Sequence, residues 1–210
     1  MLATKQVPIQ QSALLVIDAQ ESFKLGPRWA RRNNLNFEKN VGELIRIYRE
    51  AKLPVIFFLH TDPDPGFERG NPHLKLMDFI QPRADEPVIL KDTRNVFTST
   101  GLAAQLVEKG VRRVAVCGIQ MEQCCETSAR VAADLGYAVD FVTEATMTFP
   151  IKNLDNPAEE LGVDAIRERT EYALRGRFAT ISSVERLRQE LASAAGKRAQ
   201  AEQQAERKAV

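Results

Sequence analysis

The stretch VRRVAVCGIQMEQCCETSARVAADLGYAVDFVTEA, residues 111–145, holds three successive local patterns. Residues 111–118 form a short apolar run that ends on a glycine, and residues 137–145 form a second apolar run. Both runs are typical of buried parallel strands. Residues 124–136 are predicted to form a helix that stops at Gly136. A strand, a helix and a strand in this order predict a parallel sheet with a crossover helix.

The same alternation extends over the rest of the chain. Six strands alternating with helices predict an α/β fold, a single-domain three-layer structure whose mostly parallel six-stranded sheet has helices on both faces. No internal repeat or domain linker interrupts the pattern. The other predicted strands are 13–18, 54–60, 87–91 and 177–183, and the other predicted helices are 37–52, 98–110 and 158–176.

The segment after the last strand has a different composition. Val184, Leu187 and Leu191 keep an apolar spacing, and the chain then becomes rich in helix formers without an apolar stripe. We therefore expect a domain at residues 1–183 and a helical or disordered tail at 184–210. The three apolar residues offer a surface that needs cover.

Composition excludes several classes of function. The chain is 44% hydrophobic and 27% charged with a formal net charge of +1, so no global field attracts nucleic acid or anionic lipid. The N-terminus lacks the apolar core of a signal peptide, and no apolar run reaches the length of a membrane span. Three cysteines, two of them adjacent, do not form a disulfide framework, which favours the cytoplasm. We expect neither a nucleic-acid nor a membrane partner.

Three reactive side chains fall at the carboxyl ends of predicted strands, where parallel sheets bind ligands. Asp18 ends the first strand, Lys91 ends the third, and Cys124 begins the helix after the fourth. Each alone has a plain explanation, as a turn acid, a surface lysine or a small buried residue. Together they make a thiol nucleophile whose pKa is lowered by a helix N-terminus and an ammonium group, with a carboxylate to move the proton.

Longer segments around these residues point to a family. With LLVIDAQESF (14–23), ILKDTRNVF (89–97), VAVCGIQMEQCCETSARVAADLGY (114–137) and EATMTFP (144–150), the chain resembles the isochorismatase-like cysteine hydrolases. That superfamily includes nicotinamidases, N-carbamoylsarcosine amidases and isochorismatases. The resemblance covers about residues 12–183. It implies a catalytic triad of Asp18, Lys91 and Cys124, a small-molecule substrate with a C–N bond in an amide, ureido or carbamoyl group, and a homo-oligomer, dimer or tetramer.

The same resemblance assigns roles around the nucleophile. It implies an oxyanion hole from backbone N–H groups at Gln120 and Cys124, which is typically worth a few kcal/mol. Similar hydrolases carry a non-proline cis peptide here, which corresponds to Ile119–Gln120. Cys125 lies about 100° further around the helix and is expected to turn into packing.

Further residues are candidates for the substrate pocket. Gln20 is expected to orient neighbouring groups. Ordinary core packing explains the aromatic candidates equally well. The candidate pocket walls are Phe23, Trp29, His60 and Phe97.

We expect no metal and no cofactor. Nicotinamidases similar to this chain bind a metal through an Asp-x-His pair and a second histidine, but here His60 precedes Asp62, and His73 lies in a proline-rich loop. The chain has no GxGxxG or GxxxxGK[ST] segment for a nucleotide and no GxSxG segment for a serine nucleophile.

Three alternatives stay open. Isochorismatases hydrolyse a vinyl ether, and that step does not need a cysteine. A degenerate, non-catalytic scaffold could bind partners through its sheet edge or tail. Cys124 and Cys125 could act as a redox pair, although a disulfide between adjacent cysteines closes a strained ring.

Overall fold

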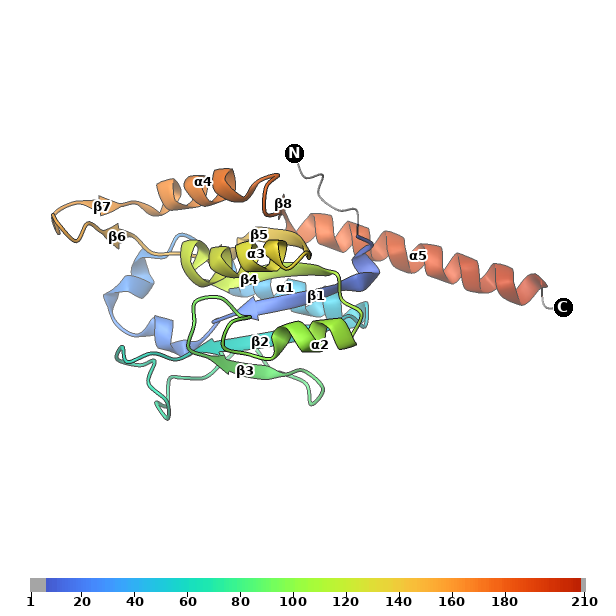
Figure 1. Ribbon diagram of the computed structural model, residues 1–210, viewed down its shortest axis with the longest axis horizontal. Coiled ribbons are helices and arrows are strands. Elements are labelled where there is room, and N and C mark those ends of the chain that lie inside the picture. The colour runs from blue at the N-terminus through green and yellow to red at the C-terminus, as the bar shows by residue number, and fades with distance from the viewer. Residues whose placement is uncertain (1–6, 209–210) are drawn as a thin grey trace.

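The computed structural model describes residues 7–208 and confirms the predicted α/β fold (Figure 1). Six parallel strands form one sheet in the order β3-β2-β1-β4-β5-β8. The chain enters the sheet at its centre and builds outward in both directions, as right-handed crossovers permit. The strands are β1 (Ser12–Ile17), β2 (Val55–His60), β3 (Val88–Lys91), β4 (Arg113–Ile119), β5 (Ala138–Met147) and β8 (Thr180–Ser182).

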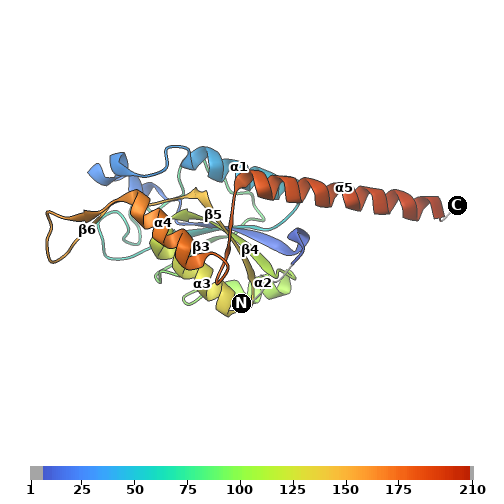
Figure 2. The same ribbon diagram turned by 90° about the horizontal axis from the view of Figure 1, so that it is seen from above.

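Helices cover both faces of the sheet (Figure 2). One hydrophobic core lies under α1 (Phe37–Glu50) and α5 (Val184–Lys208), and a second lies under α2 (Leu102–Glu108) and α3 (Glu126–Asp134). The helix α4 (Val163–Leu174) adds its last residue to the second core. The sheet is therefore the middle layer of three.

The central strands are apolar after their first residues, Ser12 in β1 and Arg113 in β4, because both faces of the sheet are covered there. Every residue of β1 and β4 is buried. Leu14 and Val16 of β1 point into the core under α1, while Leu15 and Ile17 point into the core under α3. Alternation along the strand thus supplies both cores from one apolar run.

The prediction of a helix over 158–176 was wrong in its first turn. Residues 158–162 instead belong to a hairpin in which β6 (Ile151–Lys152) pairs antiparallel with β7 (Glu160–Leu161). The helix α4 begins only at Val163, after Gly162 in an extended conformation. Strands of two residues are too short to show a period in the sequence.

The tail is a single long helix whose first turns belong to the core. Val184, Leu187 and Leu191 are buried in the core under α1, so the surface that seemed to need a partner is covered within the chain. Beyond Ala194 the described side chains of α5 are exposed, and the helix projects from the body (Figure 1). No helix within residues 7–208 is long and apolar enough to cross a membrane.

Candidate active site

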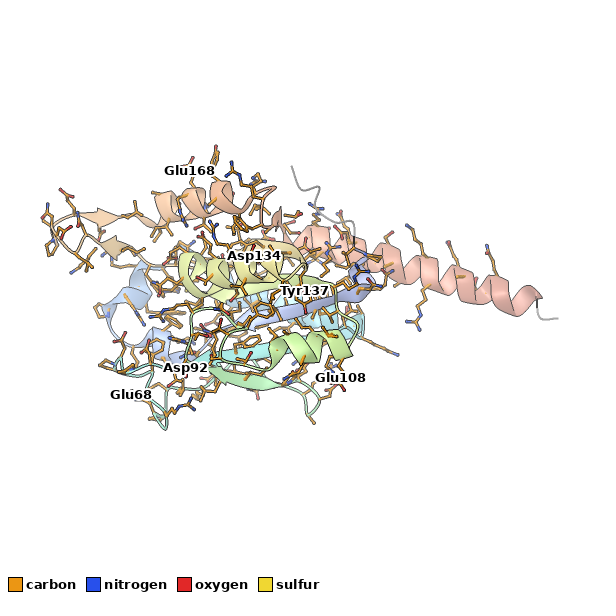
Figure 3. The ribbon with its side chains drawn as sticks, in the orientation of Figure 1. Glu68, Asp92, Glu108, Asp134, Tyr137 and Glu168 are labelled. Carbon is orange, nitrogen blue, oxygen red and sulfur yellow. The ribbon has the colours of Figure 1, made fainter. Side chains whose placement is uncertain are left out.

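Asp18, Lys91 and Cys124 meet at the carboxyl edge of the sheet. Asp18 directly follows β1, and Lys91 is the last residue of β3, two strands away. Cys124 lies in the π-helical turn Met121–Cys125 that links β4 to α3. Figure 3 labels Asp92, next to Lys91, at this edge, and Glu108 at the end of α2 that lies toward the opposite edge.

Direct contacts join Lys91 to Asp18. Lys91 Nζ donates to Asp18 Oδ2 at 2.8 Å and to the Thr93 carbonyl at 3.1 Å, and neither ionic side chain has exposed surface. Asp18 Oδ1 has no hydrogen-bond partner among the described residues. Asp18 and Cys124 come within 4.8 Å of each other through a carboxylate oxygen and Sγ. One carboxylate thus lies between a fixed ammonium group and a thiol.

His60, expected as a pocket wall, lies inside this cluster. One of its ring nitrogens lies within 4.8 Å of the Asp18 carboxylate and the Cys124 sulfur, and Nδ1 is 3.4 Å from Lys91 Nζ. Gln20 fixes its main chain, since Gln20 Nε2 donates to the His60 carbonyl at 3.0 Å and the His60 N–H donates to Gln20 Oε1 at 2.7 Å. The Gln20 side chain thus holds the main chain of His60 at the end of β2.

The ring of His60 lies among charged groups. Both ring nitrogens face groups that can only donate, since Nδ1 is 3.4 Å from Lys91 Nζ and Nε2 is 2.6 Å from Arg94 Nη1. Nε2 also lies 3.1 Å from Asp62 Oδ2. Burial lowers the pKa of His60, and Lys91 lowers it further. The ring is therefore neutral near pH 7.

The thiol differs from the expectation of a lowered pKa. Burial raises the pKa of the Cys124 thiol, the Asp18 carboxylate raises it further, and Lys91 opposes both. Burial alone would lower the pKa of Lys91, but Asp18 and Cys124 outweigh that effect and raise it. The prediction of a preformed thiolate was wrong because it left out the cost of ionising a side chain that is 3% exposed.

The side chains here do not fit a metal ion. Asp18, His60 and Cys124 offer an oxygen, a nitrogen and a sulfur within reach of one ion. However, Lys91 Nζ already contacts the Asp18 carboxylate at 2.8 Å and His60 Nδ1 at 3.4 Å. A divalent cation there would meet an ammonium group at close range, which is strongly unfavourable in a buried site. His73 lies in the loop after β2, and its carbonyl accepts from Ser22 Oγ.

The backbone at the end of β4, just before Cys124, has an unusual geometry at two positions. The peptide bond between Ile119 and Gln120 is cis, as the resemblance implies. Gly118 has φ of +128°, and a Cβ there would lie 1.8 Å from the Ile17 carbonyl oxygen. Only glycine allows β4 to pass so close to β1 before the turn. Cys125 is fully buried among core residues and burial raises its pKa, which confirms its packing role.

The aromatic candidates divide between two places. Phe23 and Trp29 gather near Phe149, with ring centroids 6.1 Å and 6.4 Å from it. Phe97 instead stacks on Tyr137 at 6.1 Å, in the core under α3. The structure therefore brings Phe23 and Trp29 together but keeps Phe97 apart from them.

A family model for the isochorismatase domain matches residues 12–185. The chain belongs to the isochorismatase family. An isochorismatase family protein of Bacillus subtilis, YrdC, is 25% identical over 85% of the chain and 95% of its own length. Nicotinamidase 3 of Arabidopsis thaliana is 33% identical over 66% of the chain and 74% of its own length. Streptothricin hydrolase of Streptomyces noursei is 30% identical over 77% of the chain and 59% of its own length.

A solved structure agrees with the sequence match. An isochorismatase-family protein from Chromobacterium violaceum has a TM-score of 0.81 at 26% identity and covers 88% of this chain and 95% of its own. The fold of this isochorismatase-family hydrolase is thus that of its relatives.

Sequence reasoning missed two residues of the site. Arg94 and Asp62 both contact the His60 ring, although neither was a candidate. Their positions three residues after Lys91 and two after His60 were the available signal, because residues just past a strand end share its edge of the sheet.

Two cavities of this protein lie away from the cluster of Asp18, Lys91 and Cys124. One, of about 790 Å³, is lined by residues that include Arg113, Tyr137 and Asp140 near the amino ends of the strands. The other, of about 350 Å³, borders the middle of β5 at Thr143 and the end of β8 at Ser182. Neither is lined by Asp18, Lys91 or Cys124. The candidate site is therefore identified by its reactive side chains and not by the volume of a cavity.

Proposed function

We propose that this chain is a cysteine hydrolase that cleaves the C–N bond of a small amide, ureido or carbamoyl substrate through a thioester, with Asp18, Lys91 and Cys124 as its triad. The observation that carries the proposal is the Asp18 carboxylate. One of its oxygens accepts from Lys91 at 2.8 Å, and the other has no partner among the described residues, beside a thiol. A nucleophile, a base and a group that orients the base are the parts that covalent catalysis needs.

Because the Cys124 thiol is protonated at rest, the first step has to include removal of its proton. Asp18 removes the proton from Cys124 as the sulfur attacks the substrate carbonyl, so the thiolate forms only during attack. Lys91 compensates the negative charge that moves from the carboxylate to the sulfur and then to the carbonyl oxygen. Backbone N–H groups at Gln120 and Cys124 would stabilise that oxygen.

The remaining steps return the enzyme to its starting state. Protonated Asp18 gives its proton to the leaving amine as the C–N bond breaks, which leaves a thioester on Cys124. Asp18 then removes a proton from a water molecule that attacks the thioester, and the thiol leaves with that proton. The products are an amine and a carboxylic acid from an amide, or an amine and a carbamic acid from a ureido or carbamoyl substrate.

Two relatives support amide chemistry through their names. Nicotinamidase 3 and streptothricin hydrolase are named for hydrolysis, and nicotinamide is an amide.

Purified full-length protein tested against a panel of small amides, ureides and vinyl ethers checks the proposal. Cys124→Ala should lower amide hydrolysis at least about 10³-fold. Cys125→Ala, the matched control, should keep most activity and cost about 1 kcal/mol of stability. Full activity in both variants would exclude thiol chemistry and favour vinyl-ether hydrolysis. Loss only in Cys125→Ala would contradict the assigned nucleophile.

A further inference from the structure

The hydroxyl of Ser128 joins two segments of the candidate active site. Ser128 lies in α3, one turn after Cys124, and is fully buried. Its Oγ donates to the Cys124 carbonyl at 2.6 Å and accepts from the backbone N–H of Val96 at 3.2 Å. A serine in a helix often donates to the carbonyl four residues earlier, so the first bond alone indicates no special role. The second bond reaches the loop between β3 and α2 (residues 92–101), 32 positions away in the sequence.

That loop also provides contacts to the reactive cluster. The Thr93 carbonyl accepts from Lys91 Nζ at 3.1 Å. Arg94 Nη1 lies 2.6 Å from Nε2 of His60. The loop bonded to the Ser128 hydroxyl is therefore the one that surrounds the ammonium group of the candidate triad.

Ser128 anchors the first half of this loop to the body of the protein. Within the described chain, residues 92–96 form no hydrogen bond between two backbone groups. Several side chains of the loop bond to other residues of the loop and so do not fix its place in the protein. Val96 is fully buried, and a buried N–H needs a partner. The Ser128 hydroxyl supplies that partner and thereby holds the loop.

We propose that Ser128 is a positioning residue, whose hydroxyl holds the loop beside Lys91 at a fixed place relative to Cys124. The inference rests on the proposed function for the reaction that this placement serves. A single hydroxyl suits the role because it can donate to the nucleophile turn and accept from the loop at once. The attraction between an ammonium group and a developing thiolate falls with their separation, so a displaced loop weakens it.

The rate at which iodoacetamide alkylates Cys124 tests this placement without turnover. Ser128→Ala should lower that rate about tenfold at about pH 8, because a displaced ammonium group stabilises the thiolate less. Ser128→Thr keeps a hydroxyl and should restore most of the rate. Ala132→Gly is the matched control, since Ala132 is fully buried one turn further along the same helix and has no side chain that can hydrogen-bond. Its rate should equal that of the wild type although its fold is less stable.

A double-mutant cycle shows whether Ser128 acts through Lys91. Lys91→Met removes the ammonium group, so adding Ser128→Ala to it should change the alkylation rate less than about twofold. A further tenfold loss there would overturn the proposal, because Ser128 would then act on the thiol by another route. An unchanged rate in folded Ser128→Ala, or an equal loss in Ala132→Gly, would overturn it as well.

Amide hydrogen exchange tests the anchor in the unaltered chain. Measured by NMR, the Val96 N–H should exchange about 10²-fold more slowly than the N–H groups of residues 93–95, which lack such a bond. Equal rates at these four positions would show that the loop is not held by Ser128, whether or not the variants fold.

Steady-state kinetics connects this placement to hydrolysis. For an amide that the enzyme cleaves, Ser128→Ala should lower kcat and leave KM nearly unchanged, because the buried hydroxyl bonds to the protein backbone and not to substrate. Slower alkylation of Ser128→Ala in a chain that hydrolyses no amide would keep the placement and reject only the proposed function. Hydrolysis that depends on Cys124, together with a full alkylation rate in Ser128→Ala, would reject only the role of Ser128.

Discussion

At the scale of single residues, the protonation state of Cys124 depends on its surroundings more than on its place near a helix start. The thiol is 3% exposed and lies beside the Asp18 carboxylate, and both features raise its pKa. Asp18 is therefore better suited to remove the proton during attack than to coexist with a resting thiolate. This order of events follows from placing two negative charges in one buried site.

The pH dependence of alkylation reports this state. Because the pKa of Cys124 lies above its ordinary value, its rate with iodoacetamide should rise about tenfold per pH unit up to about pH 9 without a plateau. Asp18→Asn removes a negative charge and should speed the reaction at about pH 8, whereas Lys91→Met should slow it. Stopped-flow or mass-spectrometric rates measure both effects. A plateau below about pH 8 would show a lowered pKa instead.

Gly118 is a second residue whose role comes from one close approach. A Cβ at this position would overlap the Ile17 carbonyl oxygen at 1.8 Å, and φ is +128°. Gly118→Ala should destabilise the fold by about 3 kcal/mol or more, or prevent folding. Gly42→Ala in α1 is the control, because its Cβ would meet nothing within 4 Å. That change should stabilise by about 0.5–1 kcal/mol. Urea unfolding compares the two, and similar values would contradict the close approach.

At the scale of elements, α5 divides into a part that packs and a part that projects. Leu187 is fully buried under α1, whereas the described side chains beyond Ala194 are exposed. The first turns complete the core on one face of the sheet, and the later turns contribute no buried side chain to that core. An amphipathic helix is stable here because its start is packed.

Truncation and substitution separate these parts of α5. Leu187→Ala should cost about 2–4 kcal/mol, as for other fully buried leucines. A chain that stops at Ala195 should lose less than about 1 kcal/mol, since it keeps every buried side chain of the helix. Thermal and urea unfolding give both values. A truncated chain as unstable as Leu187→Ala would mean that the projecting turns are packed in solution.

At the scale of the whole molecule, the site is assembled from groups that neutralise one another. Lys91 lies between Asp18 and His60, where a metal ion would have to bind. We therefore expect hydrolysis to survive extensive dialysis against EDTA. Activity that disappears on dialysis and returns with zinc, iron or manganese would show that a metal displaces Lys91 in the working enzyme.

The oligomeric state stays a prediction of the family resemblance. The apolar residues Val184, Leu187 and Leu191 no longer support it, since they are covered within the chain. Light scattering at micromolar concentration should still give a mass above 23.5 kDa, the mass of one chain. A mass near that of one chain would contradict the resemblance on this point.

The sequence by itself determined the fold class, the six strands and the edge where the reactive residues meet. Apolar runs that end on Asp18, Lys91 and the turn at Gly118 were sufficient to predict the strands and the edge of the sheet where they end. The hydrophobic pattern of a strand and the direction in which it runs can both be read from a few consecutive residues. Only the tertiary structure decided the rest. The pKa of Cys124 and the place of His60 beside Asp18 depend on contacts between residues distant in sequence. Burial and charge act through space, and so no local pattern records them.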